Sequence, residues 1–334
     1  MSGNSVATSI PEIILNHTKV DVAIMGEGDI TIVDLLRAID SGGSISDVNG
    51  IAFKDNGRIN YTSNRDVVSE LDTLGFPDWD IFDLDKYNKY SAINSARFIS
   101  DHTVSYPLNG ARGCPYQCTF CYHVFKQQKY RRYSEDVVMG EIRRLHYKYN
   151  CNHISFWDEL SFSNVKSVSV MVDKLGGLDF PVCWEASARG GLFKREHIGL
   201  IRSMKASGCD SISFSLENAD PDILAAMKKK MNVSQFIEQV KALWDGGVTP
   251  LTSVIFGYPQ ESSESIQATI DVCEECGIFP SVGYLLPLPG TQIYEWAKKN
   301  GKINDEVEYL ERIGDRQDFH INLTAMSDEE FVDT

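Results

Sequence analysis

From residue 103 onward the chain repeats one pattern, a short apolar run followed by a longer amphipathic run. Six apolar runs predict strands: Thr103–Asn109, His153–Trp157, Val182–Ala186, Ser211–Leu216, Leu251–Phe256 and Ser281–Leu286. Runs with helical spacing follow each strand: Glu135–Tyr149, Val165–Leu175, Lys194–Ser207, Val233–Trp244, Ser263–Cys276 and Thr291–Lys299. Strands that alternate with helices predict a parallel sheet covered by helices. Six units are too few for an eight-unit barrel, so we expect an α/β fold with a partial (β/α)6 TIM-like barrel.

The first seventy residues carry a shorter α/β pattern. It predicts a strand at Val20–Met25, a helix at Thr31–Ile39, and a hairpin around the Asn56-Gly57 turn. Between Leu71 and Tyr90 no clear period appears, and we expect an extended connector held by Phe76, Trp79 and Phe82. The predicted organisation is therefore an α/β segment (1–70), a linker (71–102), a barrel (103–300) and a C-terminal extension (301–334).

Composition and charge narrow the class of protein. The 334 residues are 43% hydrophobic and 24% charged, which is typical of a soluble globular protein. With 32 Lys and Arg against 47 Asp and Glu the net charge is −15, which disfavours nucleic-acid and membrane-surface binding. No apolar run is long enough for a membrane span, and the N-terminus lacks a signal-peptide pattern. We therefore expect a cytoplasmic protein whose eight cysteines are reduced.

Three of these cysteines are clustered directly after the first predicted barrel strand. Cys114, Cys118 and Cys121 are separated by three and two residues on a loop that also contains Gly113 and Pro115. Clustered thiolates suit iron–sulfur clusters or zinc. In a cluster of four irons, three local cysteines leave one iron open for a reactive ligand. Zinc would require a fourth ligand, and the nearby residue His123 is a candidate.

The CxxxCxxC loop, with an aromatic residue before its last cysteine, resembles the radical S-adenosylmethionine (SAM) superfamily. The resemblance implies a [4Fe–4S] cluster held by Cys114, Cys118 and Cys121, with SAM chelated by the open iron. It also implies that Phe120 and Tyr122 lie against the cofactor. One-electron reduction of SAM would then release a 5′-deoxyadenosyl radical that abstracts a hydrogen from the substrate.

The residues that follow the later strands also resemble this superfamily, whose members contact SAM at these positions. Asp158 or Glu159, after the second strand, would accept from the SAM amino group, although Asp158 is equally suited to cap a helix. Arg189, after the third strand, would face the SAM carboxylate, because a guanidinium pairs well with a carboxylate. A surface salt bridge is the alternative for Arg189.

The fourth and fifth strands end in further candidates for cofactor binding. Ser215 and Glu217 would contact the methionyl or ribose groups of SAM, and a carboxylate that ends a buried strand requires some partner. Gly257, in a Gly/Pro turn, would let the backbone approach a bound adenine or substrate.

The first seventy residues resemble the end of a cobalamin-binding (B12) domain, as found before some radical SAM barrels, and the resemblance implies a partial Rossmann-like α/β segment. The resemblance rests on short segments that include Gly26-Glu27-Gly28-Asp29 and Gly50-Ile51. Taken alone, the first of these indicates an ordinary strand-to-helix turn. The Asp-x-His-x-x-Gly pattern that binds cobalt is absent, and His17, the only histidine before His102, does not match it. We expect a shortened family member, a partial reading frame or a fragment, in which cobalamin binding is doubtful.

The remaining cysteines and basic runs are expected to be structural. Cys273 and Cys276 lie in a helical period with acids between them, which opposes redox activation. Three cysteines are predicted to be small core residues: Cys151, Cys183 and Cys209. Two basic groups are predicted to be solvated: Lys126, Lys129, Arg131 and Arg132, and then Lys228, Lys229 and Lys230.

The sequence thus favours a radical SAM enzyme that methylates, cyclises or rearranges a small molecule or peptide. A flavodoxin or ferredoxin would supply electrons. Three alternatives stay open: an RNA-modifying member of the superfamily, a non-catalytic iron–sulfur or zinc protein, and an inactive truncated relative. The charge of −15 argues against the first of these alternatives.

Overall fold

The computed structural model describes residues 1–94, 103–122 and 128–334, so the predictions for His123 and Lys126 lie outside the described residues. Five parallel strands form one sheet in the order β10-β9-β8-β7-β4. Their bounds are β4 Ser105–Leu108, β7 His153–Phe156, β8 Cys183–Ser187, β9 Cys209–Ser213 and β10 Thr249–Leu251. A parallel pair continues the wall: β11 Ser253–Phe256 and β12 Ser281–Tyr284.

Strands β10 and β11 are consecutive parts of one extended stretch, interrupted at Thr252. Before the break the stretch pairs with β9, and after it the stretch pairs with β12. The Oγ1 atom of Thr252 accepts from the backbone N–H of Leu216 at 3.2 Å, and an isolated bridge joins Glu217 to Val254. The wall therefore has six strands in chain order, as the sequence predicted.

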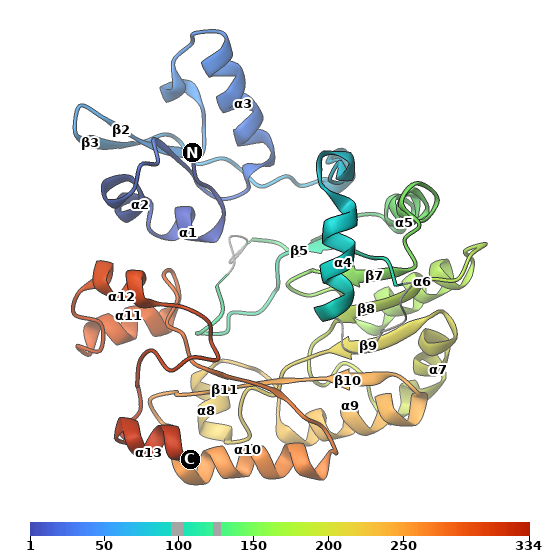
Figure 1. Cartoon of the computed structure of the whole chain (residues 1–334). Coiled ribbons are helices and arrows are strands. Elements are labelled where there is room, and N and C mark those ends of the chain that lie inside the picture. Colours follow the sequence, from blue (N-terminus) through green and yellow to red (C-terminus); the bar gives the residue numbers. More distant parts are fainter. Residues whose placement is uncertain (95–102, 123–127) are drawn as a thin grey trace.

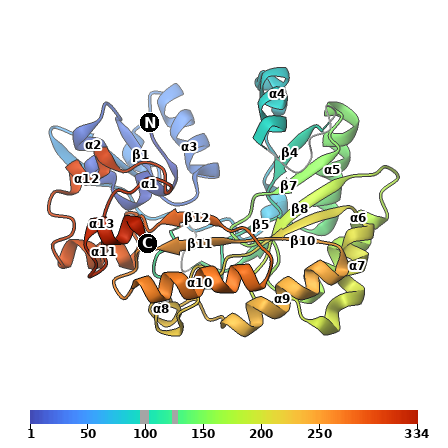
Figure 2. The same ribbon diagram turned by 60° about the horizontal axis from the view of Figure 1, so that its bottom comes forward.

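Helices cover the outer face of this wall (Figure 1). Their bounds are α5 Glu135–Tyr149, α6 Val165–Gly176, η4 Arg195–His197, α7 Ile198–Ala206, α8 Pro221–Ala226, α9 Val233–Gly246 and α10 Ser263–Glu275. Three more helices follow β12: α11 Gln292–Lys299, α12 Glu306–Arg312 and α13 Asp328–Asp333. Figure 2 shows α8, α9 and α10 lying along the strands β10 to β12. Among the described residues, no helix combines the length and apolar character required to cross a bilayer.

The two faces of the wall differ in polarity. Ile154, Trp184 and Ile212 are buried in the main core. The residues that alternate with them are polar: Ser155, Glu185 and Ser211 lie opposite one another in register and line a cavity of about 250 Å³. Parallel strands that only pack between helices are apolar on both faces. The inner face is therefore built to hold polar groups.

The N-terminal unit has its own small core of Val22, Ile24, Leu35, Val48 and Ile51. Its elements are α1 Asn4–Ser9, α2 Pro11–His17, β1 Val22–Ile24, α3 Gly28–Asp40, η1 Ile45–Asp47, β2 Ile51–Asp55 and β3 Arg58–Tyr61. The three strands pair antiparallel in the order β1-β2-β3, and Ser2 bridges Ala23 in parallel. Asn56 and Gly57 both have positive φ, which confirms the predicted hairpin turn.

The connector between the two units packs against the barrel core. It contains η2 Leu71–Thr73, η3 Trp79–Ile81 and α4 Leu84–Asn94. Leu71 is buried in the main core, Phe76 stacks on Tyr133 with ring centroids 5.0 Å apart, and Trp79 meets Tyr106 edge-on at 5.2 Å. Phe82 is 42% exposed and contacts the ring of Trp79. Aromatic contacts of this kind fix the path of residues 71–83. The prediction of an extended connector is wrong from Leu84 onward, where α4 begins.

Candidate functional site

The three clustered cysteines lie on a loop whose ends are joined. Two short strands, β5 Ala111–Arg112 and β6 Arg131–Arg132, pair antiparallel and close the segment 113–130, which we call the cluster loop. Within it Cys114 and Cys118 are partly exposed and Cys121 is exposed. The loop follows β4, so its thiols lie at the carboxyl end of the barrel strands, where reactive groups of such folds gather.

Asp158 and Glu159 hold the backbone at the start of the cluster loop. The Oδ1 atom of Asp158 accepts from the N–H groups of Gly110 and Ala111, both at 2.9 Å. The Oε2 atom of Glu159 accepts from the N–H of Gly113 at 3.0 Å. Burial raises the pKa of Asp158 to about 6. Both residues therefore have partners in the chain itself, and their predicted contact with the SAM amino group stays a prediction.

The alternative of a helix cap for Asp158 is wrong. Helix α6 begins at Val165, and its cap is Asn164, whose side chain accepts from the N–H of Ser167.

Arg189 stacks on the cluster loop and presents an unused hydrogen-bond donor. Its guanidinium carbon lies 3.5 Å from the ring centroid of Tyr116. Its buried Nη2 atom has no hydrogen-bond partner among the described residues, and no carboxylate in this part of the chain pairs with the side chain. A buried guanidinium N–H without an acceptor is costly, which makes it a fitting donor for an anionic group of a ligand.

A second buried group surrounds Glu217. The Nζ atom of Lys229 lies 2.7 Å from Oε1 of Glu217 and 2.9 Å from Oγ of Ser215, and 5.9 Å from the ring centroid of Phe120. Lys229 is 7% exposed and Glu217 is 4% exposed. The Oε2 atom of Glu217 is buried and has no partner among the described residues. The predicted residues Phe120, Ser215 and Glu217 are thus brought together.

The prediction that Arg131 is solvated is wrong, because its side chain is buried. Lys229 is a second residue that sequence reasoning missed, because the run Lys228 to Lys230 was predicted to be solvated. Its two neighbours are exposed and both have positive φ, so the turn directs the middle lysine inward. The available signal was the carboxylate itself, since a buried Glu217 requires a partner and this run is the next basic segment in the chain. The prediction for Cys183 as a core residue is also wrong, because it is exposed.

Two predicted residues remain, Tyr122 and Gly257, and both contact other parts of the chain. Tyr122 hydrogen-bonds to Ser9 of the N-terminal unit, and its ring lies so close to Gly290 that a Cβ there would be 2.4 Å from Cε2. Gly257 has φ of +114°, and a Cβ there would meet the ring of Phe331 at 3.2 Å. The open side of Gly257 therefore faces the C-terminal helix, and its approach to a ligand stays a prediction.

The chemistry of the donor set fits an iron–sulfur cluster. Across residues 1–94, 103–122 and 128–334, no three His, Cys, Asp or Glu side chains converge on a position where one ion could bind. A cubane cluster attaches each cysteine sulfur to a different iron, so its thiolates need not converge on one atom. Three thiols on one loop, beside the unused donor of Arg189, fit a [4Fe–4S] cluster that carries SAM.

Comparisons with known proteins agree with this geometry. Residues 108–273 match the model of the radical SAM superfamily. An uncharacterized methyltransferase of Pyrococcus horikoshii is 29% identical over 89% of this chain and 62% of its own length. Cytidylyl-2-hydroxyethylphosphonate methyltransferase of Streptomyces wedmorensis is 25% identical over 99% of this chain and 66% of its own length. The chain thus spans about two thirds or less of these relatives.

Two solved structures share the fold at low sequence identity. The methyltransferase TsrM of Kitasatospora setae, with tryptophan and a SAM analogue bound, superposes with a TM-score of 0.71 at 14% identity, covering 90% of this chain and 58% of TsrM. The cobalamin-dependent radical enzyme OxsB, with aqua-cobalamin bound, gives 0.68 at 18% identity, covering 92% of this chain and 43% of OxsB. The cluster loop, the six-stranded wall and these similarities lead to one conclusion: the chain carries a domain of the radical SAM superfamily, which spans residues 108–273.

Proposed function

We propose that the protein is a radical SAM enzyme that methylates or cyclises a small-molecule or peptide substrate. The observation that carries the proposal is the cluster loop at the carboxyl end of β4, with the unused Nη2 donor of Arg189 stacked beside it. Bound to Cys114, Cys118 and Cys121, a [4Fe–4S] cluster would supply the electron that cleaves a C–S bond of SAM, which would release methionine and leave a 5′-deoxyadenosyl group able to take a hydrogen atom from the substrate.

Residues of the chain bind and orient the cofactors in this proposal. Cys114, Cys118 and Cys121 hold the cluster, and Arg189 donates to the SAM carboxylate. The unpaired oxygen of Glu217 accepts from a hydroxyl or amino group of SAM, while Lys229 holds the carboxylate in place. Asp158 and Glu159 fix the backbone that leads into the loop.

The reaction class and partners are proposed from the relatives. The two methyltransferases that align with 89% and 99% of this chain favour methyl transfer, and a magnesium-protoporphyrin IX monomethyl ester cyclase of Rubrivivax gelatinosus, 26% identical over 79% of the chain, keeps ring formation as the second reaction. His17 is exposed on α2, and we assign no cobalamin contact to the described residues. A reductant such as flavodoxin or ferredoxin and a cytoplasmic location complete the proposal.

Anaerobic reconstitution tests the proposal directly. The protein is loaded with iron and sulfide, reduced with dithionite in the presence of SAM, and 5′-deoxyadenosine is measured by mass spectrometry. We expect product from the wild type and none from C118A. A fully loaded cluster that yields no 5′-deoxyadenosine would contradict the proposed function.

A second experiment tests the SAM site. R189Q should weaken SAM binding at least tenfold without changing iron content, because it removes a charge-assisted hydrogen bond. R202Q, on the exposed face of α7, is the matched control and should bind SAM like the wild type. Unchanged SAM affinity in R189Q would show that the carboxylate binds elsewhere.

A further inference from the structure

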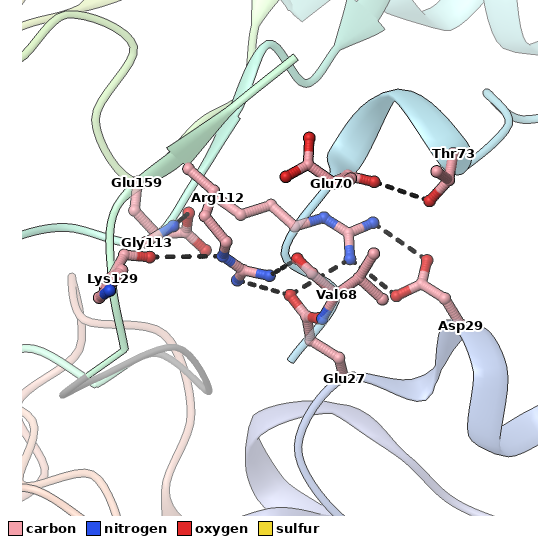
Figure 3. A network of polar contacts seen from close by, with 10 residues as sticks. Glu27, Asp29, Val68, Glu70, Thr73, Arg112, Gly113, Lys129 and Glu159 are labelled. Atoms are coloured by element: carbon pink, nitrogen blue, oxygen red, sulfur yellow. Dashed lines mark hydrogen bonds and ion pairs between the residues drawn. The ribbon is translucent and has the colours of Figure 1, made fainter. Parts of the chain in front are cut away.

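The N-terminal unit reaches the base of the cluster loop through buried charges (Figure 3). Five residues form this group, which we call the Glu27 network: Glu27, Asp29, Val68, Arg112 and Arg131. Glu27 caps α3 and Asp29 lies in its first turn, Val68 lies just before the connector, and the two arginines lie on the strands β5 and β6. Glu27 is 8% exposed and Arg131 is 9% exposed, so this pair is screened from solvent, whereas Asp29 lies at the exposed edge of the network.

Each end of the cluster loop is held by a carboxylate of the N-terminal unit. Arg112, two residues before Cys114, pairs with both oxygens of Asp29, at 2.7 and 3.0 Å. Arg131, at the other end of the loop, donates to Oε1 of Glu27 at 2.7 Å and to the carbonyl oxygen of Val68. The Oε2 atom of Glu27 accepts from the N–H of Val68 at 2.7 Å, so the carboxylate is itself fixed.

Glu27 also offsets a repulsion that the closed loop creates. Arg112 and Arg131 are paired directly across β5 and β6, and like charges in that position destabilise a strand pair. The Oε1 atom of Glu27 lies 3.4 Å from one guanidinium and 2.7 Å from the other. A single negative charge thus bridges two positive charges where the loop closes, and that bridge is strong because the site is buried.

We propose that Glu27 and Asp29 are positioning residues of the iron–sulfur site, which hold the two ends of the cluster loop through Arg131 and Arg112. The N-terminal unit is then part of the machinery that holds the cluster. This inference rests on the proposed function, because it assumes a cluster on the three cysteines. Both carboxylates act through the arginines that they contact.

The first experiment measures how fast the cluster loses iron. Reconstituted, reduced protein is mixed with a ferrous chelator, and iron release is followed by absorbance for the wild type, E27Q, D29N and D34N. Asp34 is the matched control, because it pairs with Arg65 at 2.6 Å in the same part of the molecule without contacting the cluster loop. We expect E27Q to release iron at least fivefold faster than the wild type, D29N to be intermediate, and D34N to be unchanged.

Two further variants separate positioning from general stability. E27D keeps the charge and should restore slow release, and in E27Q/R131Q the repulsion is removed, so release should return toward the wild-type rate. Melting temperatures are recorded for every variant. If E27Q and D34N release iron at the same rate, or if E27Q lowers the melting temperature without changing release from the folded protein, the inference is wrong.

A spectroscopic readout completes the test. Addition of SAM to the reduced cluster should change its electron paramagnetic resonance spectrum in the wild type and in D34N, and the change should be altered in E27Q. An identical SAM-induced change in E27Q would contradict positioning. A wild type that assembles no cluster would instead defeat the proposed function, so the two failures are distinct.

Discussion

The buried pair of Lys229 and Glu217 allows a quantitative prediction. Replacing Lys229 with methionine keeps most of the volume but removes the cation that lies 2.7 Å from the carboxylate. Oε2 of Glu217 already has no partner among the described residues. K229M would also remove the donor to Oε1, so a buried carboxylate would remain without its cation. Breaking a buried ion pair on one side costs about 3–5 kcal/mol of unfolding free energy. We expect a loss in this range.

Urea unfolding of the cluster-free protein, followed by circular dichroism, measures this loss without any contribution from metal binding. K228M is the matched control, because Lys228 is exposed and donates to Oε1 of Gln292 at the surface, so a change of less than about 1 kcal/mol is expected. In E217Q/K229M both charges are gone, and most of the stability should return. The reasoning is refuted if K229M stays within about 1 kcal/mol of the wild type, or if the double variant is as unstable as K229M.

Three further predictions concern the loop and the barrel. C118A should lose the iron–sulfur absorbance after reconstitution, and a full cluster in this variant would refute the ligand assignment. G208A should cost at least about 2 kcal/mol in urea unfolding, because φ is +95° and a Cβ would lie 2.0 Å from the carbonyl oxygen of Val182, whereas G199A, which meets nothing within 4 Å, should be neutral or stabilising. Because the pKa of Asp158 is about 6 in the folded state and 3.8 ordinarily, the folded state holds the proton more tightly, and stability should fall by about 2 kcal/mol as pH rises from 4 to 6. D158N should flatten that slope, and equal slopes in both proteins would exclude Asp158 as its source.

The barrel was predictable because each of its strands and helices carries its own local pattern. The break at Thr252 was not, since the apolar run Leu251–Phe256 continues through it. The strand changes neighbour there, from β9 to β12, and the choice of neighbour depends on the whole wall. Periodicity records which face a residue occupies but contains no information about the partner strand.

The site was predictable where its residues are adjacent in sequence and unpredictable where they pair at long range. The spacing of the three cysteines indicates by itself that they bind one cluster or metal together. Glu27 lies in a turn that looks ordinary, and its role depends on Arg131, 104 residues away. Lys229 lies within a run of three lysines, and nothing in the sequence distinguishes it from its neighbours. In the structure the positive φ of Lys228 and Lys230 directs its side chain inward. Pairings of this kind are set by tertiary packing, which local propensity does not encode.

The connector has a mechanical consequence for the whole molecule. A linker that is solvated over its length acts as a tether and lets two units move independently. Here Leu71 is buried in the barrel core, and Phe76 and Trp79 pack against it. The segment therefore restricts movement of the N-terminal unit relative to the barrel. Any swing of the N-terminal unit about this segment would have to pull apolar side chains out of that core. The geometry between the turn at Glu27 and the cluster loop is therefore held by this packing, and the amides of Thr73 and Leu74, which donate to the carbonyl oxygens of Glu70 and Leu71, are expected to be protected in hydrogen-exchange measurements.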